Sequence, residues 1–176
     1  MWNSNPLIDQ ILDDYKDQLL HDYTKYRNHA YRVYHACTLL DPQPQNSTKY
    51  AIAASFHDLG IWTKKTFDYL DPSISLAKDW LVKHNSEKWS DEISLMISMH
   101  HKVTRYTGTF AETVEIFRKA DWIDVSLGLM KFGTDGKKLN QIQKLFPTKG
   151  FHRFLIRKTL RNLLHHPLKP LPMFKF

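Results

Sequence analysis

The stretch YAIAASFHDLGIW, residues 50–62, decides how the rest of the chain is interpreted. It begins as an apolar helix and reaches the adjacent His57 and Asp58, with Gly60 two residues later. Because glycine accepts the left-handed conformation that closes many helices, Gly60 predicts a helix end with His57 and Asp58 on the last turn. Free carbonyl groups there favour a cation. An imidazole and a carboxylate in neighbouring positions suit zinc, iron, manganese or nickel, with magnesium less favoured.

Apolar residues recur at helical spacing on both sides of this stretch, and no segment has a convincing strand pattern. The sequence contains no internal repeat. We therefore predict an all-α fold, in which loops rich in proline or small polar residues separate the helices. The predicted helices cover about residues 7–19, 23–40, 48–58, 74–84, 90–100, 110–125, 137–145 and 151–164.

Capping residues predict where three of these helices begin. Ser47 or Thr48 can cap the helix that carries the His-Asp pair, and Ser90 can cap the helix expected over about 90–100. Thr109, with Glu112 three residues later, has the spacing of a capping box.

The 176 residues, of which 42% are hydrophobic, suffice for one well-buried core and are few for two domains. We predict a single domain over residues 1–176. Its motif-bearing core covers about 23–128, and a C-terminal helical extension with a proline-rich tail covers about 137–176.

The single cysteine, Cys37, has no internal partner for a disulfide, and the first ten residues lack the pattern of a signal peptide. A reducing, cytoplasmic location is therefore expected. No apolar run reaches the roughly 18 residues needed to span a bilayer, so we expect no membrane partner.

The chain is basic, with 25 Lys and Arg against 18 Asp and Glu and a net charge of +7. A basic surface raises the local concentration of anions such as phosphates. The positive charge concentrates toward the C-terminal end. No nucleic-acid-binding motif accompanies it, so nucleic acid is disfavoured as a partner.

Several titratable side chains fall on inward helix faces. A lone histidine on an apolar face is more often an ordinary core residue, but a buried aspartate needs a cation or several hydrogen-bond donors. Asp121 shares a stripe with Val114, Phe117 and Val125, and the other acids of its helix lie at or beyond the edges of this stripe. The inward titratable residues are His29, His57 with Asp58, His84, His100 with His101, and Asp121.

The order of these residues resembles the signature of the HD-domain metal-dependent phosphohydrolases, a histidine followed by an adjacent His-Asp pair and a distant aspartate. The similarity covers most of residues 23–128. It rests on RNHAYRV around His29, AASFHDLG around His57 and Asp58, and FRKADWIDVSLG around Asp121. The resemblance implies an HD-like helical bundle in which these four residues hold a divalent ion of manganese, iron, zinc, nickel or magnesium.

Some HD-domain proteins hold two metals and carry further histidines between the His-Asp pair and the last aspartate. His84, His100 and His101 lie in that interval and are candidate ligands of a second metal. Alternatively, His84 is a surface or packing residue, and His100 or His101 contacts substrate phosphate. The chain lacks the Gly-Tyr-Pro sequence of the cyclic-dinucleotide branch, which argues against that substrate.

The resemblance implies hydrolysis of a phosphate ester, with a nucleotide or another small phosphorylated metabolite as substrate. A metal ion activates its bound water and polarises the phosphoryl oxygen. Asp58 and Asp121 would orient that water. Lys102 and Arg105, close in sequence to the ligands, would offset charge on the phosphoryl group.

The loop over residues 63–71 begins just beyond Gly60 and is expected to form one wall of the pocket, where Asp68 would contribute to turnover. Two other functions stay open, a di-iron oxygenase of the HD type and a non-catalytic nucleotide-binding module. The sequence also leaves open the substrate, the native metal and whether the chain forms a homo-oligomer.

Overall fold

The computed structural model describes residues 3–66, 68–165 and 173. Over these residues the chain is a single all-α bundle without a β-strand, and eight of its helices have eight or more residues. The helices are α1 (Pro6–Asp13), α2 (Lys16–Leu19), α3 (Tyr23–Leu40), α4 (Pro44–Phe56), α5 (Gly60–Thr63), α6 (Leu70–Lys83), α7 (Ser90–Met99), α8 (Ala111–Val125), α9 (Gly136–Leu145) and α10 (Phe151–His165), with 3-10 turns at Leu20–Asp22 and Glu87–Trp89.

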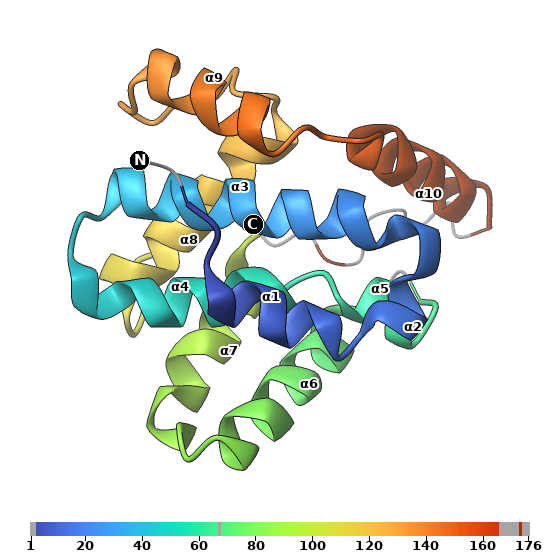
Figure 1. Cartoon of the computed structure of the whole chain (residues 1–176), viewed down its shortest axis with the longest axis horizontal. Coiled ribbons are helices and arrows are strands. Elements are labelled where there is room, and N and C mark those ends of the chain that lie inside the picture. Colours follow the sequence, from blue (N-terminus) through green and yellow to red (C-terminus); the bar gives the residue numbers. More distant parts are fainter. Residues whose placement is uncertain (1–2, 67, 166–172, 174–176) are drawn as a thin grey trace.

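Helix α3 is the central element of the bundle and crosses the whole molecule (Figure 1). It packs against α1, α4, α8, α9 and α10. Because neighbours cover it on most sides, its buried residues are not confined to one stripe and include Asn28, Arg32 and His35 as well as apolar side chains. Polar groups on α3 therefore lie inside the protein and need partners there.

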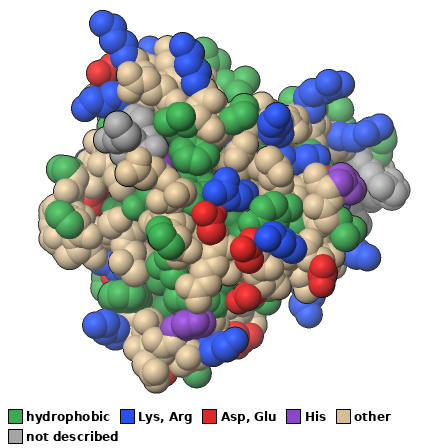
Figure 2. Space-filling view, in the orientation of Figure 1, with side chains coloured by type: hydrophobic (Ala, Val, Ile, Leu, Met, Phe, Trp, Pro, Cys, Tyr) green, Lys and Arg blue, Asp and Glu red, His purple; other side chains and the backbone are tan. Residues whose placement is uncertain are grey.

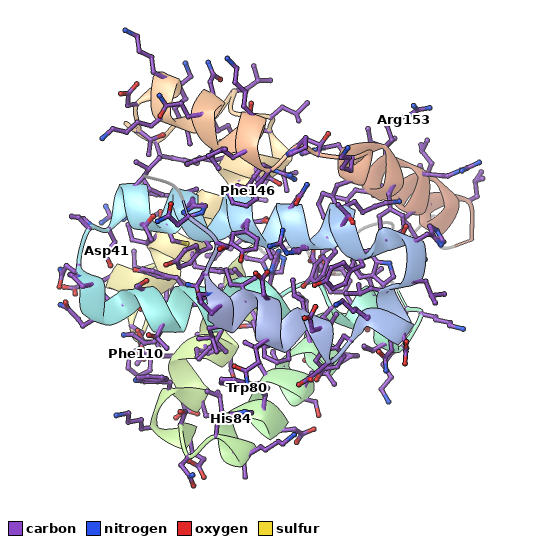
Figure 3. The ribbon with its side chains drawn as sticks, in the orientation of Figure 1. Asp41, Trp80, His84, Phe110, Phe146 and Arg153 are labelled. Carbon is purple, nitrogen blue, oxygen red and sulfur yellow. The ribbon has the colours of Figure 1, made fainter. Side chains whose placement is uncertain are left out.

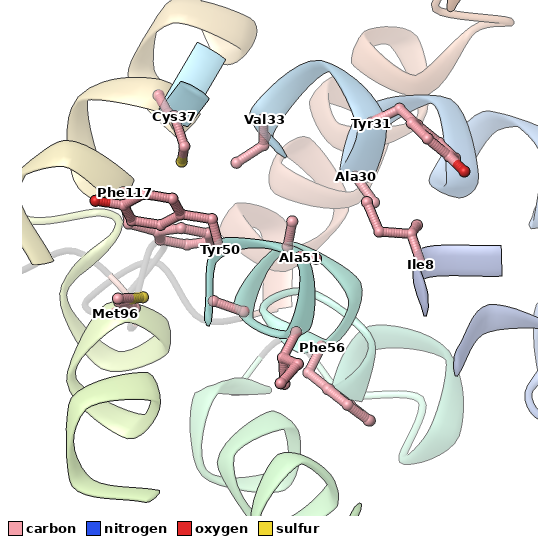
Figure 4. Packing of buried hydrophobic residues seen from close by; sticks show 14 of the residues in the cluster. Ile8, Ala30, Tyr31, Val33, Cys37, Tyr50, Ala51, Phe56, Met96 and Phe117 are labelled. Carbon is pink, nitrogen blue, oxygen red and sulfur yellow. The ribbon is translucent and has the colours of Figure 1, made fainter. Parts of the chain in front are cut away.

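The hydrophobic core lies between α3 and α4 and extends to the α6–α7 hairpin (Figure 4). Small residues let the two helices approach closely: Ala51, Ala53 and Ala54 on α4 are fully buried. Large side chains from α1, α7 and α8 fill the remaining space, among them Ile8, Met96 and Phe117. This packing fixes the end of α4, which carries the His-Asp pair.

The helix ends differ from the predictions made from capping residues. Helix α4 begins at Pro44, whose ring fixes a helical φ at the first position, and the Ser47 hydroxyl instead bonds to Tyr34. Ser90 is already helical, because a 3-10 turn precedes it. The Thr109–Glu112 capping box is absent at this described helix start, where Phe110 at φ 56° stands as the N-cap without a side-chain bond.

Two other boundaries were also predicted wrongly. The helix expected over 7–19 is interrupted between α1 and α2, and the helix expected from residue 74 begins at Leu70. In contrast, α9 and α10 lie where the sequence predicts them, and Asp135 caps α9 by accepting a bond from the Lys137 amide. Among the described residues, none of the helices has both the length and the apolar character to cross a bilayer.

Gly60 does not close a helix in the left-handed conformation, contrary to the prediction. It is the first residue of α5, and the glycines with positive φ are others. A Cβ atom at Gly60 would lie only 2.5 Å from the Tyr69 carbonyl oxygen and 3.0 Å from Ser73 Oγ. Glycine is therefore required here because the start of α6 passes so close to the backbone.

Candidate metal centre

Four helices bring titratable side chains to one buried point. His29 comes from the middle of α3, His57 and Asp58 follow the last residue of α4, and Asp121 comes from α8. His100 and His101 follow the last residue of α7. All of these side chains are buried except His101, which is slightly exposed.

The first group combines two histidines and two aspartates. His29 Nε2 lies 2.8 Å from His57 Nε2, 3.5 Å from Asp58 Oδ2 and 3.8 Å from Asp121 Oδ1. His57 Nε2 lies 3.6 Å and 3.7 Å from the same two carboxylate oxygens. Atoms that bind one zinc ion at about 2.0–2.2 Å lie on the order of 3 to 3.5 Å apart, so this set matches the span of one coordination sphere.

The outer nitrogens of these two histidines are already engaged. His29 Nδ1 lies 2.6 Å from Asp124 Oδ2, and His57 Nδ1 lies 2.9 Å from the Ala54 carbonyl oxygen. Because both partners are acceptors, each Nδ1 donates a proton, and each neutral ring presents a bare lone pair at Nε2. Two lone pairs facing each other at 2.8 Å repel unless a proton or a metal cation lies between them.

The pKa values of the two rings describe the metal-free state of this pair. Burial alone would lower the pKa of His29, but the carboxylates of Asp124 and Asp58 outweigh it and raise the pKa to about 9. Burial lowers the pKa of His57 to about 3. One proton on His29 therefore lies between the rings at neutral pH, in the position where a metal would supply positive charge.

A second group shares Asp58 with the first. His100 Nε2 lies 3.5 Å from Asp58 Oδ1, and His101 Nδ1 lies 3.7 Å from Asp121 Oδ2. The ligand atoms of Asp58, His100 and His101 all lie within 4.8 Å of one another. His100 Nδ1 donates to the Ile97 carbonyl at 2.6 Å, which leaves its Nε2 as a lone pair toward the carboxylate. The two sets of donors share Asp58, and each set could hold a metal ion.

The unpaired atoms of the site provide a direct test of the metal assignment. Within the described part of the chain, Asp58 Oδ1, His100 Nε2 and both Asp121 carboxylate oxygens are buried without a hydrogen-bond partner. Burial raises the pKa of Asp121 to about 7, and repulsion by the Asp58 carboxylate acts in the same direction. Buried acceptors without donors are costly, and divalent cations held by the two groups would satisfy them. The nitrogen and oxygen donors suit zinc, iron, manganese or nickel.

The positions of the first ligands are fixed by neighbours that sequence analysis missed. Asp124, which we placed at the edge of its helix stripe, is buried, because α3 and the first turn of α10 cover that side of α8 as well. Its carboxylate accepts bonds from His29 and from Arg32, with Arg32 Nη2 at 3.0 Å. The three-residue spacing from Asp121 to Asp124, matched by that from His29 to Arg32, is the signal that could have revealed the pair.

Aromatic residues close other sides of the site. Tyr69, in the segment before α6, has its hydroxyl 2.7 Å from His101 Nε2. Phe151, the first residue of α10, stacks on the His29 ring with centroids 4.0 Å apart. The expected wall over residues 63–71 therefore reaches the second group through Tyr69, while Phe67 of the same loop lies outside the described residues.

Three predicted site residues are not part of the cluster. His84 lies at the far end of α6, where its ring stacks on Trp80 and its Nδ1 donates to the Trp80 carbonyl (Figure 3). This is the packing role that the sequence left open as the alternative. The side chains of Asp68 and Arg105 are exposed, whereas Lys102, half-buried, directly follows His101.

Comparisons with protein-family models, with curated proteins and with solved structures found no match to this chain. The observations that bear on its function are therefore those of the site itself.

Proposed function

We propose that the chain is a metal-dependent phosphohydrolase of the HD type, acting on a nucleotide or another small phosphorylated metabolite. The observation that carries the proposal is the convergence of His29, His57, Asp58 and Asp121, whose lone pairs and carboxylate oxygens face one another in a buried site. A retired site would not need two buried aspartates with unsatisfied oxygens.

A divalent ion held by these residues would supply Lewis acidity and an activated water molecule. The chain's own residues have separate tasks around it. Asp124 and the Ala54 carbonyl fix the two imidazole rings, so that Nε2 faces inward in each. Asp121 and Asp58 would orient the attacking water by accepting hydrogen bonds from it. Lys102 directly follows His101 in the sequence, and its positive charge would offset charge that develops on the phosphoryl group.

The experiment measures bound metal and released phosphate in the same samples. Protein purified without chelator is analysed for metals and then assayed against nucleotides and sugar phosphates with several divalent ions. His57→Ala should lose both metal and turnover. The matched control is His84→Ala, which removes a histidine outside the cluster and should keep both. Full metal occupancy in His57→Ala would contradict the proposed centre.

The second donor group favours one alternative, a di-iron oxygenase, because Asp58 is shared between two sets of ligands. The oxygenase would be supported, and the hydrolase rejected, by two irons per chain, a visible absorption band, and oxygen consumption in place of phosphate release. Tight metal binding without turnover of any substrate in the panel would favour the non-catalytic nucleotide-binding module.

A further inference from the structure

The last helix, α10, is apolar on two opposite sides. On its inner side Phe151 is fully buried and Leu155 packs against the core. On its outer side lies an exposed aliphatic stripe, whose residues recur at steps of four, three and one. The members of this stripe are Ile156 (58% exposed), Leu160 (55%), Leu163 (41%) and Leu164 (82%). The core covers only the inner side of α10, so the outer stripe has no partner among the described residues.

The charged residues of the C-terminal segment that carries the stripe are all basic. Residues 136–176 contain ten of the 25 Lys and Arg and none of the 18 Asp and Glu, so that residues 1–135 hold 15 basic and 18 acidic residues. On α10, Arg153 and Arg157 lie one turn apart, in register with Leu160, at the border of the stripe. Figure 2 shows Lys and Arg side chains gathered over this helix, and Figure 3 shows Arg153 directed outward.

We propose that the outer side of α10 binds an anionic lipid surface, with the helix axis parallel to the membrane. An exposed aliphatic stripe bordered by Arg and Lys is the pattern of helices that lie at the bilayer interface. The stripe from Ile156 to Leu164 extends about 12 Å along the axis, long enough for two helical turns to enter the interface. The expectation of no membrane partner rested on the absence of a spanning segment, which this mode of binding does not require.

Other occupants match the surface less well. A second copy of the chain, packed stripe to stripe, would place Arg153 and Arg157 of each helix at an interface where α10 offers no acidic side chain to neutralise them. A nucleic acid would pair with the arginines but would leave four aliphatic side chains in water. An acidic amphipathic protein segment offers both chemistries but needs a groove or matching ridge, whereas lipid adapts to a convex helix.

The test is co-sedimentation of the full-length protein with vesicles of phosphatidylcholine, with and without phosphatidylserine. The protein should sediment with the anionic vesicles and be released by salt. Each arginine near such a surface contributes about fivefold to the partition coefficient, so Arg153→Gln with Arg157→Gln should lower it roughly 25-fold. Ile156→Ser with Leu160→Ser should abolish binding.

The control is Val82→Ser, which changes an aliphatic side chain that is equally exposed (60%) on α6 and should leave binding unchanged. All variants are checked for helical circular dichroism and metal content, so that a folding defect is recognised. Equal binding to neutral vesicles, or equal loss in the Val82 variant, would overturn the proposal. Failure of the wild-type protein to sediment with anionic vesicles at low salt would also overturn it and leave an acidic protein segment as the occupant.

Discussion

Without its metal, the protein should lose stability as the pH rises from about 6.5 to about 9. In the metal-free folded state, burial alone would lower the pKa of His29. The carboxylates of Asp124 and Asp58 outweigh this effect and raise the pKa from 6.5 to about 9. Between these values the folded chain keeps a proton that the unfolded chain has released. The free energy of unfolding therefore falls with increasing pH over this interval, and the stabilisation is complete only below pH 6.5.

The expected loss is on the order of 3 kcal/mol, because each pKa unit corresponds to about 1.4 kcal/mol and the two values differ by about 2.5. Of the other groups, His100 acts in the same direction as His29, because burial lowers its pKa but the interaction with Asp58 outweighs burial and raises it. His57 and Asp121 change the loss little above pH 6.5. His57, with its pKa lowered to about 3 by burial, is neutral in both states above pH 6.5. Asp121, with its pKa raised to about 7 mainly by burial, acts in the same direction as His29 but loses most of its contribution below the interval.

The measurement is urea unfolding followed by circular dichroism, on chelator-stripped and metal-loaded protein at several pH values in this interval. Bound metal replaces the proton, so the stability gained from metal should increase as the pH rises. Asp124→Asn should flatten the slope of the stripped protein, whereas His84→Ala should keep it. A stripped wild-type protein whose stability is constant or rises from pH 6.5 to 9 would refute the assigned proton between His29 and His57.

Three further substitutions test individual contacts. Asp121→Asn should weaken metal binding strongly while the stripped protein loses little stability or gains some, since a buried charge disappears; a variant that melts far below the stripped wild type yet keeps the full gain from metal would contradict this. Gly60→Ala places a Cβ 2.5 Å from the Tyr69 carbonyl oxygen and should cost about 1–3 kcal/mol, measured by urea unfolding; unchanged stability would show that the close approach relaxes freely. Tyr69→Phe removes the hydroxyl next to His101 and should weaken binding of a second metal about 10- to 100-fold in a metal titration, with the first metal unaffected; equal weakening of both would indicate general disorder of the site.

The sequence predicted the elements that depend on periodicity and missed those that depend on contacts between distant segments. The helices and the inward faces of His29 and Asp121 follow from apolar spacing, because a helix buries whichever side is apolar. The predicted helix ends were wrong more often. The capping residues Ser90 and Thr109 do not set the helix starts, because neighbouring helices impose the path of the chain there. One helix start is preceded by a 3-10 turn, and at the other Phe110 adopts a left-handed conformation.

Gly60 and Asp124 show the same limit within the site. Glycine was expected for its own backbone conformation, but the requirement comes from Tyr69 and Ser73, which no local pattern reveals. Asp124 lies on the side of α8 that would face water if that helix packed against one neighbour only. His84 continues the apolar stripe of α6, where it stacks on Trp80, but the α6–α7 hairpin places it far from the cluster. The apolar pattern predicts which face of the helix a residue lies on, and it does not predict where along the helix axis the site lies.

The stack of Phe151 on His29 has a consequence for the order in which the protein is assembled during synthesis. The same end of the chain supplies the carbonyl of Pro147 to Asn28 and that of Phe146 to Arg32, across 119 and 114 residues of sequence. Contacts between such distant residues form late, because the entropy of closing a long loop must be overcome first. On the ribosome, His29 therefore lacks its stacking partner until Phe151 has emerged, and we expect stable metal uptake only after that point.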